Sequence, residues 1–467
     1  MNLLIKNGTV VTSREVKQAD ILIRQGKIDS LLNSFPRGAY DEGLADKVID
    51  AANMLVMPGG VDAHTHLDMP FMGTHSSDDF KTGTVAAAMG GTTSIIDYVI
   101  PQKGESLKEA VDKWHKKAAG KAVIDYSFHV AVVPPVDKIL QDFKYLVKSG
   151  ITSIKCFLAY KDSLMISDTD LFKLLAEAKK HKILVNIHAE NGEIIDFLTK
   201  KHLKEGKTEP IYHANSRPSA LEDEAVSRVI KIAQITKTPI YFAHLSSKGA
   251  VKEIKRAKKN GQKVFAETCP QYLILSEQKY LTDNFEGAKY VMSPPLRKFK
   301  HCHYLKKSVK AGIIDVIATD HCPFNFDGQK TMGLKDFTKI PNGIPGIETR
   351  MPLMFNEMIV KMGINLSKFV ELNCANPAKI FGLETKGDIE PGKDADIVIW
   401  NPDFIWKIKQ EILHERVDYT PYEDCSITGK LVAVISRGEI IAENGEFKAE
   451  SARGKFIYRK TSAPAYS

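Results

Sequence analysis

The stretch GGVDAHTHL (59–67) is an apolar run whose end carries Asp62, His64 and His66. Other runs rich in β-branched and aromatic residues follow it at intervals: TSIIDYVI (93–100), YSFHVAVV (126–133), TSIKCFLAY (152–160), ILVNIHAE (183–190), PIYFAHLS (239–246), KVFAETCP (263–270) and DVIATDHC (315–322). Short buried strands that alternate with longer stretches are typical of parallel βα units. With the first run there are eight strands, which predicts an α/β fold of the (β/α)₈ or TIM barrel type.

Several of the intervening stretches have apolar residues at helical spacing. The clearest are SLKEAVDKWHKKAAG (106–120), VDKILQDFKYLVKSG (136–150), DTDLFKLLAEAKKHK (168–182), ALEDEAVSRVIKIAQITK (220–237) and AVKEIKRAKKNG (250–261). We expect these stretches to be helical and to follow the strands.

Both ends of the chain read as β structure instead. The N-terminal part has a hairpin signal at Gln25-Gly26-Lys27, and the C-terminal part contains KDADIVIW (393–400) and KLVAVISRGEIIAENGE (430–446). Because these parts flank the barrel, we expect them to join into one small β-sandwich domain. The expected division is residues 1–56 and 384–446 for the sandwich, 57–383 for the barrel and 447–467 for a C-terminal arm that could pack on another subunit.

The composition is that of an ordinary globular protein, with 43% hydrophobic and 26% charged residues among 467. The formal charge of +8 is spread over the chain without an arginine-rich tract, so we expect no nucleic-acid partner. Six cysteines without a CxxC pair predict reduced thiols. The absence of a signal-peptide pattern and of an apolar run of membrane-spanning length predicts a cytoplasmic protein with no membrane partner.

A barrel carries its catalytic groups at the carboxyl ends of its strands. In His64-Thr65-His66 the two imidazoles are two residues apart, so in a strand they project to the same side and can bind one cation. The same spacing in His301-Cys302-His303 lies in a lysine-rich stretch, and we interpret it as surface.

His188, His244 and Asp320 each close an apolar strand. Either histidine alone is more readily explained as a core side chain with a hydrogen-bond partner, whereas a lone buried carboxylate is costly unless it is paired or bound to metal. Their shared position at strand ends, beside the HxH pair, favours a metal site at the barrel mouth.

Lys155 in SIKCFL places an ammonium inside a buried strand. Burial and nearby dications oppose its charged form. Carbamylation by carbon dioxide would turn the amine into a carboxylate that can bridge two metals, although a lysine that reaches solvent is the alternative.

The chain resembles the dihydropyrimidinase and D-hydantoinase family of the amidohydrolase superfamily over nearly its whole length. The resemblance lies in PGGVDAHTHLDMPFMGT (58–74), SIKCFLAYKD (153–162), NIHAENGEII (186–195), EPIYHANSRPSALEDEAV (209–226), FAHLSS (242–247), ETCPQYL (267–273), SPPLR (293–297), ATDHCPFNFDGQK (318–330), KIPNGIPGIE (339–348) and NPAKIFGL (376–383). It implies a hydrolase that opens dihydropyrimidines or 5-substituted hydantoins to N-carbamoyl amino acids, and a homotetramer.

The resemblance also implies roles for single residues. His64, His66 and Asp320 would hold one divalent metal, His188 and His244 the other, with carboxylated Lys155 as the bridge and zinc as the first choice of metal. A hydroxide between the metals would attack the ring carbonyl while Asp320 moves the proton. Tyr160 would bind the oxyanion, and Ser293 and Asn342 would bind the cyclic amide.

Other functions stay open at this point. A dihydroorotase would carry an arginine at the position of Asp68, which disfavours that activity. An allantoinase is chemically close, and a non-catalytic scaffold relative would lack metal ligands that are intact here. The apolar residues that we expect to line the substituent pocket are Met69, Phe71, Met72, Leu164 and Met165.

Overall fold

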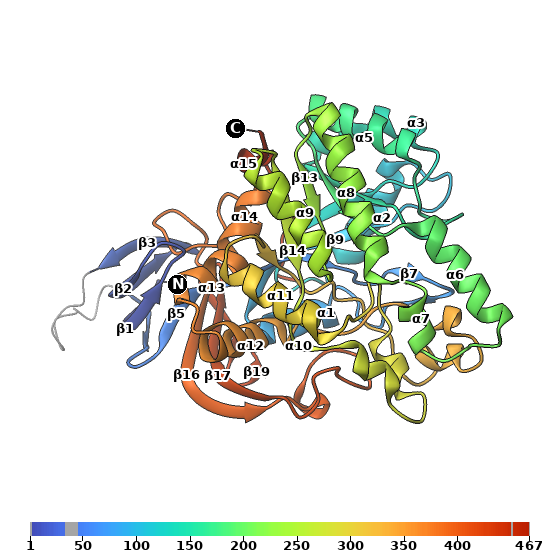
Figure 1. Cartoon of the computed structure of the whole chain (residues 1–467). Helices are drawn as coiled ribbons and strands as arrows, with labels where there is room; N and C mark the ends of the chain where they lie inside the picture. Colours follow the sequence, from blue (N-terminus) through green and yellow to red (C-terminus); the bar gives the residue numbers. More distant parts are fainter. Residues whose placement is uncertain (1, 33–44, 450–451, 467) are drawn as a thin grey trace.

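A barrel of parallel strands lies beside a mixed sheet in the computed structural model, which describes residues 2–32, 45–449 and 452–466 (Figure 1). The eight barrel strands pair in the order β15-β14-β13-β12-β11-β10-β9-β6. They are β6 (Gly60–Thr65), β9 (Thr92–Val99), β10 (Asp125–Ala131), β11 (Ser153–Phe157), β12 (Leu184–His188), β13 (Ile240–Phe242), β14 (Val264–Thr268) and β15 (Val316–Ile317). Each strand overlaps one of the predicted runs, so the barrel prediction is confirmed.

The two edge strands of this sheet meet and close the barrel. His66 N donates to His321 O over 2.9 Å. The carboxylate of Asp62 accepts from Thr319 N at 3.1 Å and from Thr319 Oγ1 at 2.6 Å. The ends of β6 and β15, which carry His64, His66 and Asp320, are therefore held side by side.

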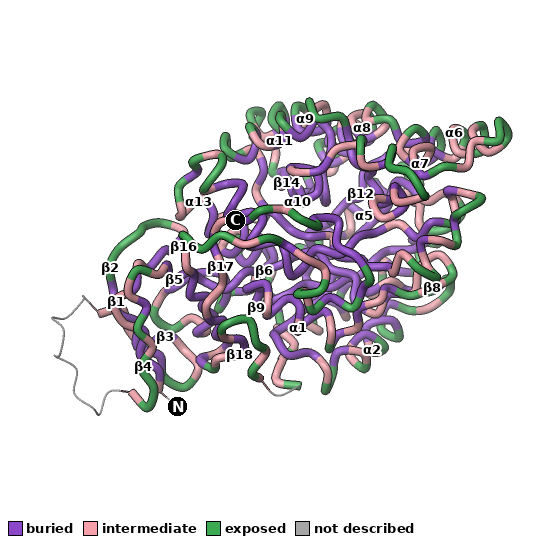
Figure 2. The backbone as a smooth tube through the Cα atoms, turned by 90° about the horizontal axis from the view of Figure 1, so that it is seen from below, coloured by how far each residue is buried: buried purple, intermediate pink, exposed green. Residues whose placement is uncertain are grey.

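Helices surround the barrel, and the strands inside them are buried except at Phe265 of β14 (Figure 2). The helices are α1 (Thr82–Met89), α2 (Leu107–Ala118), α3 (Val136–Ile139), α4 (Phe143–Lys148), α5 (Asp168–Lys180), α6 (Gly192–Lys204), α7 (Ile211–Asn215), α8 (Ser219–Thr236), α9 (Lys248–Lys259), α10 (Pro270–Ile274), α11 (Phe299–Lys310), α12 (Arg350–Met354), α13 (Leu366–Val370), α14 (Asn376–Ile380) and α15 (Ala463–Tyr466). Ser106 begins α2 with a capping box to Glu109, a pattern that fixes a helix start.

The predicted helical stretch 136–150 is helical in two pieces, because a 3₁₀ turn at Leu140–Asp142 separates α3 from α4. The apolar spacing is satisfied in two short pieces, with Val136 and Ile139 buried in the first and Phe143 and Leu146 buried in the second.

The two chain ends combine in one mixed sheet of nine strands, ordered β19-β18-β17-β16-β5-β1-β2-β3 with β4 on β1. The strands are β1 (Leu3–Val11), β2 (Val16–Arg24), β3 (Lys27–Leu32), β4 (Lys47–Asp50), β5 (Leu55–Pro58), β16 (Ile397–Lys407), β17 (Ser426–Ser436), β18 (Glu439–Glu443) and β19 (Glu446–Phe447). The halves join where β5 pairs antiparallel with β16, with Pro58 opposite Ile397. The predicted hairpin connects β2 and β3 through Gln25 and Gly26, whose positive φ values of 51° and 76° are those of a type I′ turn.

This sheet has its own apolar cluster, to which both halves contribute, including Leu3, Ile21, Ile397 and Ile435. A buried ion-pair cluster joins it to the barrel. Lys386 Nζ lies 2.7 Å from the Asp125 carboxylate of β10 and 2.8 Å from that of Asp396, which precedes β16.

The last described residues, 452–466, run along the amino-terminal end of the barrel. Ile457 N donates to Tyr126 O over 2.7 Å, and the buried Arg459 guanidinium donates to Ser127 Oγ at 2.9 Å and Ser153 Oγ at 2.8 Å. This segment therefore packs on its own barrel, while the domain boundaries and the expected contact of an arm with another subunit stay predictions.

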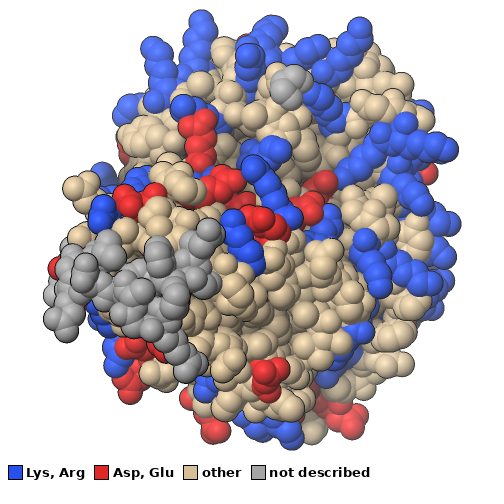
Figure 3. All heavy atoms as spheres, turned by 90° about the vertical axis from the view of Figure 1, so that its left-hand side faces the viewer, with Lys and Arg blue, Asp and Glu red and all other residues tan. Residues whose placement is uncertain are grey.

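Lys and Arg side chains gather at the top and right of the molecular face in Figure 3, and Asp and Glu form a band below them. On α9, Lys255, Arg256 and Lys259 are exposed while Ala257 is buried, as expected for a solvated helix face. Among the described residues, no helix combines the length and the apolar character that crossing a membrane requires.

Candidate active site

The predicted ligand residues converge at the carboxyl ends of the strands. His64 and Lys155 lie within β6 and β11, His188 ends β12, and His244 and Asp320 follow β13 and β15. The His64 and His244 ring centres are 5.3 Å apart, and those of His188 and His244 are 4.5 Å apart. One ligand atom from each of His64, His244 and Asp320 lies within 4.8 Å of the others, so these three side chains could hold a metal ion.

Asp320 joins the two histidines of the HxH pair. Its Oδ1 is 3.1 Å from Nε2 of His64 and 3.1 Å from Nε2 of His66. Burial opposes its charge, but the neighbouring imidazoles hold the pKa of Asp320 well below its usual value. Burial likewise opposes a charge on His64, but Glu267 and Asp320 raise the pKa of His64 to about 9. The carboxylates of Glu267 and Asp320 thus favour positive charge at this buried site.

The residues present fit a bound cation. Among the described residues, the buried nitrogens without a hydrogen-bond partner include His66 Nδ1, His244 Nδ1 and Lys155 Nζ. Burial lowers the pKa of Lys155 to about 8, that of His66 to about 4 and that of His244 well below its usual value. Buried nitrogens that lack a hydrogen-bond partner are unusual in a protein interior. The lowered pKa values of His66 and His244 keep their imidazoles in the neutral form that metal ligation requires.

Three residues of the site have left-handed backbone conformations. Tyr160, His244 and Asp320 have positive φ values of 65°, 38° and 55°. Such left-handed conformations cost about 1–2 kcal/mol for a residue with a side chain. The surrounding fold therefore stabilises three unfavourable backbone positions that present side chains to the mouth.

Tyr160, Ser293 and Asn342 lie together on the outer side of the cluster and line one small cavity with the ligand residues. Asn342 Nδ2 donates to Ser293 Oγ over 3.1 Å. Burial raises the pKa of Tyr160 to about 12, so its hydroxyl keeps its proton and can donate a hydrogen bond. The apolar wall of this cavity includes Met69, Phe71 and Leu164, as expected.

Of the other two residues expected in this wall, Met72 lines an adjoining cavity together with Phe71, Tyr160 and Leu164, and Met165 lines neither cavity. The surface prediction for His301-Cys302-His303 is wrong for its first two residues. His301 and Cys302 are buried in α11, where His301 Nδ1 accepts from Lys248 N at 3.0 Å. Only His303 of that motif is exposed.

Sequence reasoning missed Glu267 of β14, which is fully buried. Its Oε1 lies 2.7 Å from His64 Nδ1 and accepts from His244 N at 2.9 Å, while Oε2 accepts from Tyr241 OH at 2.7 Å. Glu267 is a lone carboxylate in the apolar run VFAET, and the same pattern identified Asp320 in the sequence.

Glu190 was missed as well. Its Oε2 lies 2.8 Å from His188 Nε2 and accepts from Arg217 Nη1 at 2.8 Å. Although burial acts in the opposite direction, the Arg217 guanidinium and His188 lower the pKa of Glu190 to about 2. Glu190 and Glu267 thus orient one histidine each through a ring nitrogen, as carboxylates behind metal ligands commonly do.

Comparison with known proteins agrees with this architecture. Residues 55–441 match the model of the amidohydrolase family. The D-hydantoinases of Geobacillus stearothermophilus and Ralstonia pickettii are 46% and 42% identical, over 98% of this chain and 97% and 99% of theirs. The structure of the dihydropyrimidinase from Brevibacillus agri NCHU1002 superposes with a TM-score of 0.96 at 46% identity, covering 99% of this chain and 100% of that one. This chain belongs to the amidohydrolase family, among the dihydropyrimidinases and D-hydantoinases.

Proposed function

We propose that this protein hydrolyses the cyclic amide bond of dihydropyrimidines or 5-substituted hydantoins and releases N-carbamoyl amino acids. The observation that carries the proposal is the intact set of ligand residues, four histidines, one lysine and one aspartate, gathered at a single barrel mouth. A non-catalytic scaffold relative would have no need of this set. The full-length likeness to enzymes named D-hydantoinase supports the D enantiomer as the preferred substrate.

His64, His66 and Asp320 would hold one divalent cation and His188 and His244 a second. Lys155, carboxylated on Nζ, would bridge the two. Its burial and its nitrogen without a hydrogen-bond partner support this modification, because burial opposes an ammonium there. When bound, the cations, zinc in the first instance, lower the pKa of water towards neutrality and polarise a carbonyl oxygen.

The side chains supply the remaining chemistry. Asp320 would accept the proton of the attacking water and deliver it to the ring nitrogen as the carbon–nitrogen bond breaks. Tyr160, protonated below a pKa of about 12, would donate to the oxyanion. Ser293 and Asn342 would hold the planar amide of the ring, and Met69, Phe71 and Leu164 would contact its substituent.

The test is a steady-state comparison of dihydrouracil, dihydrothymine, hydantoin, D- and L-5-phenylhydantoin and allantoin, followed by loss of ultraviolet absorbance. Metal content is measured on the same sample. We expect opening of hydantoin and dihydrouracil with about two metals per chain. A fully metallated protein that opens only allantoin, or a folded protein that binds no metal and opens no ring, would overturn the proposal.

We also propose a homotetramer and a cytoplasmic location. The first is supported by the family and is tested by light scattering with and without the segment from Phe447 onward. The second is supported by six cysteines that are all unpaired, five of them buried, as in a reducing compartment.

A further inference from the structure

Lys330 is a fully buried lysine outside the cluster of ligand residues. It begins a 3₁₀ turn, Lys330–Gly333, on the segment that follows β15. Its Nζ donates to three backbone carbonyls, of Val291 at 2.9 Å, Pro341 at 2.6 Å and Gly343 at 2.7 Å. Three acceptors match the three N–H groups of an ammonium.

Those carbonyls belong to the two loops that carry Ser293 and Asn342. Val291 stands two residues before Ser293, and Pro341 and Gly343 flank Asn342 on both sides. Gly343 N also donates to Val291 O over 3.0 Å, so the loops touch at this point. Because each peptide unit is planar, fixing the carbonyls on both sides of Asn342 leaves its own carbonyl little freedom to turn.

The charge of Lys330 has no partner of opposite sign. No carboxylate within the described part of the chain forms an ion pair with its Nζ, and burial lowers the pKa of Lys330 to about 7. The carbonyl dipoles are what favours its charged form. Burying a cation costs free energy, and an apolar side chain could fill the same space without that cost. Packing alone therefore does not explain a lysine at this position.

The preceding residue reaches the opposite wall of the pocket. Gln329 Nε2 donates to Thr74 Oγ1 at 2.7 Å and to His75 O at 2.8 Å. These two residues form β8 (Thr74–His75), which pairs with β7 (Pro70–Phe71) in a small hairpin. Phe71 of this hairpin lines the cavity, and its ring centre is 5.9 Å from that of Tyr160.

We propose that Gln329 and Lys330 form a clasp that positions both walls of the substrate pocket. Lys330 holds the loops of Ser293 and Asn342 against the ring amide, and Gln329 holds the Phe71 hairpin against the ring substituent. Neither side chain lines the cavity, so both are positioning residues rather than catalytic ones. The proposal rests on the proposed function for its substrates, but its geometry can be tested without them.

The first test replaces Lys330 by Met, which has similar length and no N–H donors. Lys330→Met should raise KM for hydantoin about tenfold while kcat changes less than about threefold, because ground-state and transition-state binding weaken together. Metal content should stay at the parent level. Lys335→Met, an exposed lysine on the same segment, is the matched control and should behave as the parent.

Hydrogen exchange gives a readout that is independent of activity. In Lys330→Met, peptides that contain residues 291–293 and 341–344 should exchange faster, while those from β11 and β12 should not change. A variant that unfolds would be replaced by Lys330→Gln, which keeps two N–H donors and should show the same pattern to a smaller degree.

The second test separates the two walls. Gln329→Ala should raise KM for D-5-phenylhydantoin about three- to tenfold and leave hydantoin within about twofold, because only the former has a bulky substituent. Gln262→Ala, which removes a bond to Ile230 O on the opposite end of the barrel, is its control.

The outcomes are distinct. Parent-like KM values and parent-like exchange in Lys330→Met would overturn the clasp. Uniformly faster exchange across the barrel would also overturn it, since Lys330 would then serve general stability. A metallated parent that opens no ring would overturn the proposed function alone, and the exchange pattern would still decide the clasp.

Discussion

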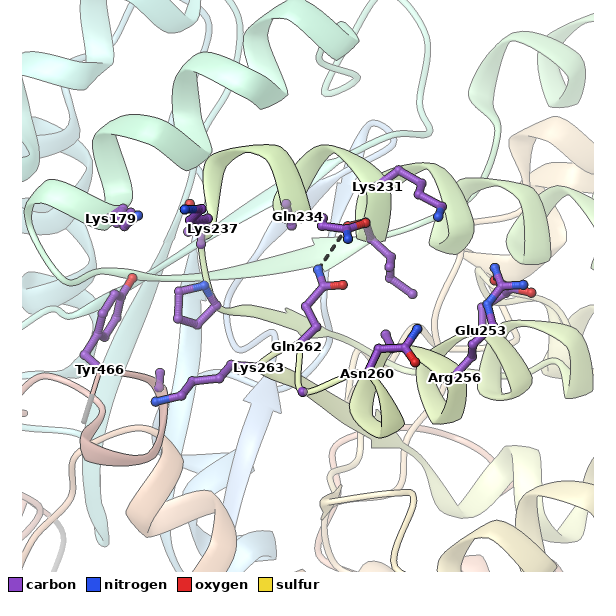
Figure 4. Close-up of a pocket in the computed structure, with 17 residues that line it drawn as sticks. Lys179, Lys231, Gln234, Lys237, Glu253, Arg256, Asn260, Gln262, Lys263 and Tyr466 are labelled. Carbon is purple, nitrogen blue, oxygen red and sulfur yellow. Dashed lines mark hydrogen bonds and ion pairs between the residues drawn. The ribbon is translucent and has the colours of Figure 1, made fainter.

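The barrel has a cavity at each end. Both are lined by charged groups, but they differ in volume and in the residues that line them. The cavity at the mouth has a volume of about 60 Å³ and is lined by the ligand residues. The cavity at the base has a volume of about 530 Å³ and is lined by Lys179, Lys231, Lys237, Arg256 and Lys263, with few acidic groups (Figure 4). The basal cavity is the larger and the more cationic of these two, but the cavity that adjoins the mouth at Phe71, Tyr160 and Leu164 has a similar volume of about 540 Å³.

Three of the five cations at the base lie where helices end. Lys179 lies in the last turn of α5 and donates to Thr236 O over 3.2 Å, and Lys237 follows the end of α8. Arg256 lies in the last turn of α9 and pairs with Glu253. The carboxyl end of a helix carries partial negative charge, which favours cations there and disfavours an anionic ligand.

The mouth has the opposite character. Its polar groups are buried and strained, and several of its nitrogens lack a partner within the described residues. The comparison teaches that buried polar groups without partners indicate chemistry, whereas exposed cations at helix ends indicate local electrostatics. The first three predictions below contrast a change at the mouth with a change at the base, and the last concerns the base.

The largest effect is expected for Lys155→Ala. Without a bridge, both cations should be lost, and turnover should fall by at least about 10⁴-fold. Metal analysis and steady-state kinetics measure this, and a short carboxylic acid should restore part of both. Lys231→Ala, an exposed lysine of the basal cavity, should change neither value; a metallated and active Lys155→Ala would contradict the bridging role.

Asp320→Asn should lower kcat about 10³- to 10⁴-fold, because it removes a ligand and the proton carrier together. Glu253→Gln at the base is the control and should retain parent kinetics. If Asp320→Asn turned over normally with full metal content, the assignment of the proton carrier would be wrong.

Glu267→Gln should weaken metal binding about 10- to 100-fold, since the amide cannot accept from His64, His244 N and Tyr241 OH at once. Titration against a chelating indicator measures the affinity. Gln262→Ala at the base should leave the affinity unchanged. An unaltered metal affinity in Glu267→Gln would show that His64 is oriented by other contacts.

The smallest effect concerns the base alone. Lys237 has a left-handed backbone with φ of 53°, so Lys237→Gly should stabilise the fold by about 0.5–1 kcal/mol. Lys179→Gly, inside the last turn of α5, should destabilise it by about 1 kcal/mol. Thermal unfolding measures both changes, and kcat should be unaffected. A change in kcat or KM in either variant would show that the basal cavity takes part in catalysis or substrate binding, contrary to our interpretation.

Much of the barrel could be predicted from the sequence, because each strand is a compact apolar run and the ligand residues stand at the run ends. The two chain ends could be assigned to one β domain because both read as strands and flank the barrel. The order of their strands in the sheet could not be predicted. The break at Leu140–Asp142 was missed because helical spacing continues across a 3₁₀ turn.

The supporting carboxylates were harder to predict. Glu190 and Glu267 act on histidines that lie 2.8 Å and 2.7 Å away, but only the fold shows which histidine each one meets. The clasp of Gln329 and Lys330 was missed because its partners are backbone carbonyls, which every residue has and no sequence pattern marks.

The pairing of β5 with β16 has a consequence for how the protein is made. During synthesis β5 emerges early, but its partner emerges only after the entire barrel. At about 5–20 residues per second this interval lasts on the order of tens of seconds. Throughout it the edge of β5 is open to wrong partners. Nascent chains should therefore depend on chaperones more strongly than the stability of the finished protein would suggest.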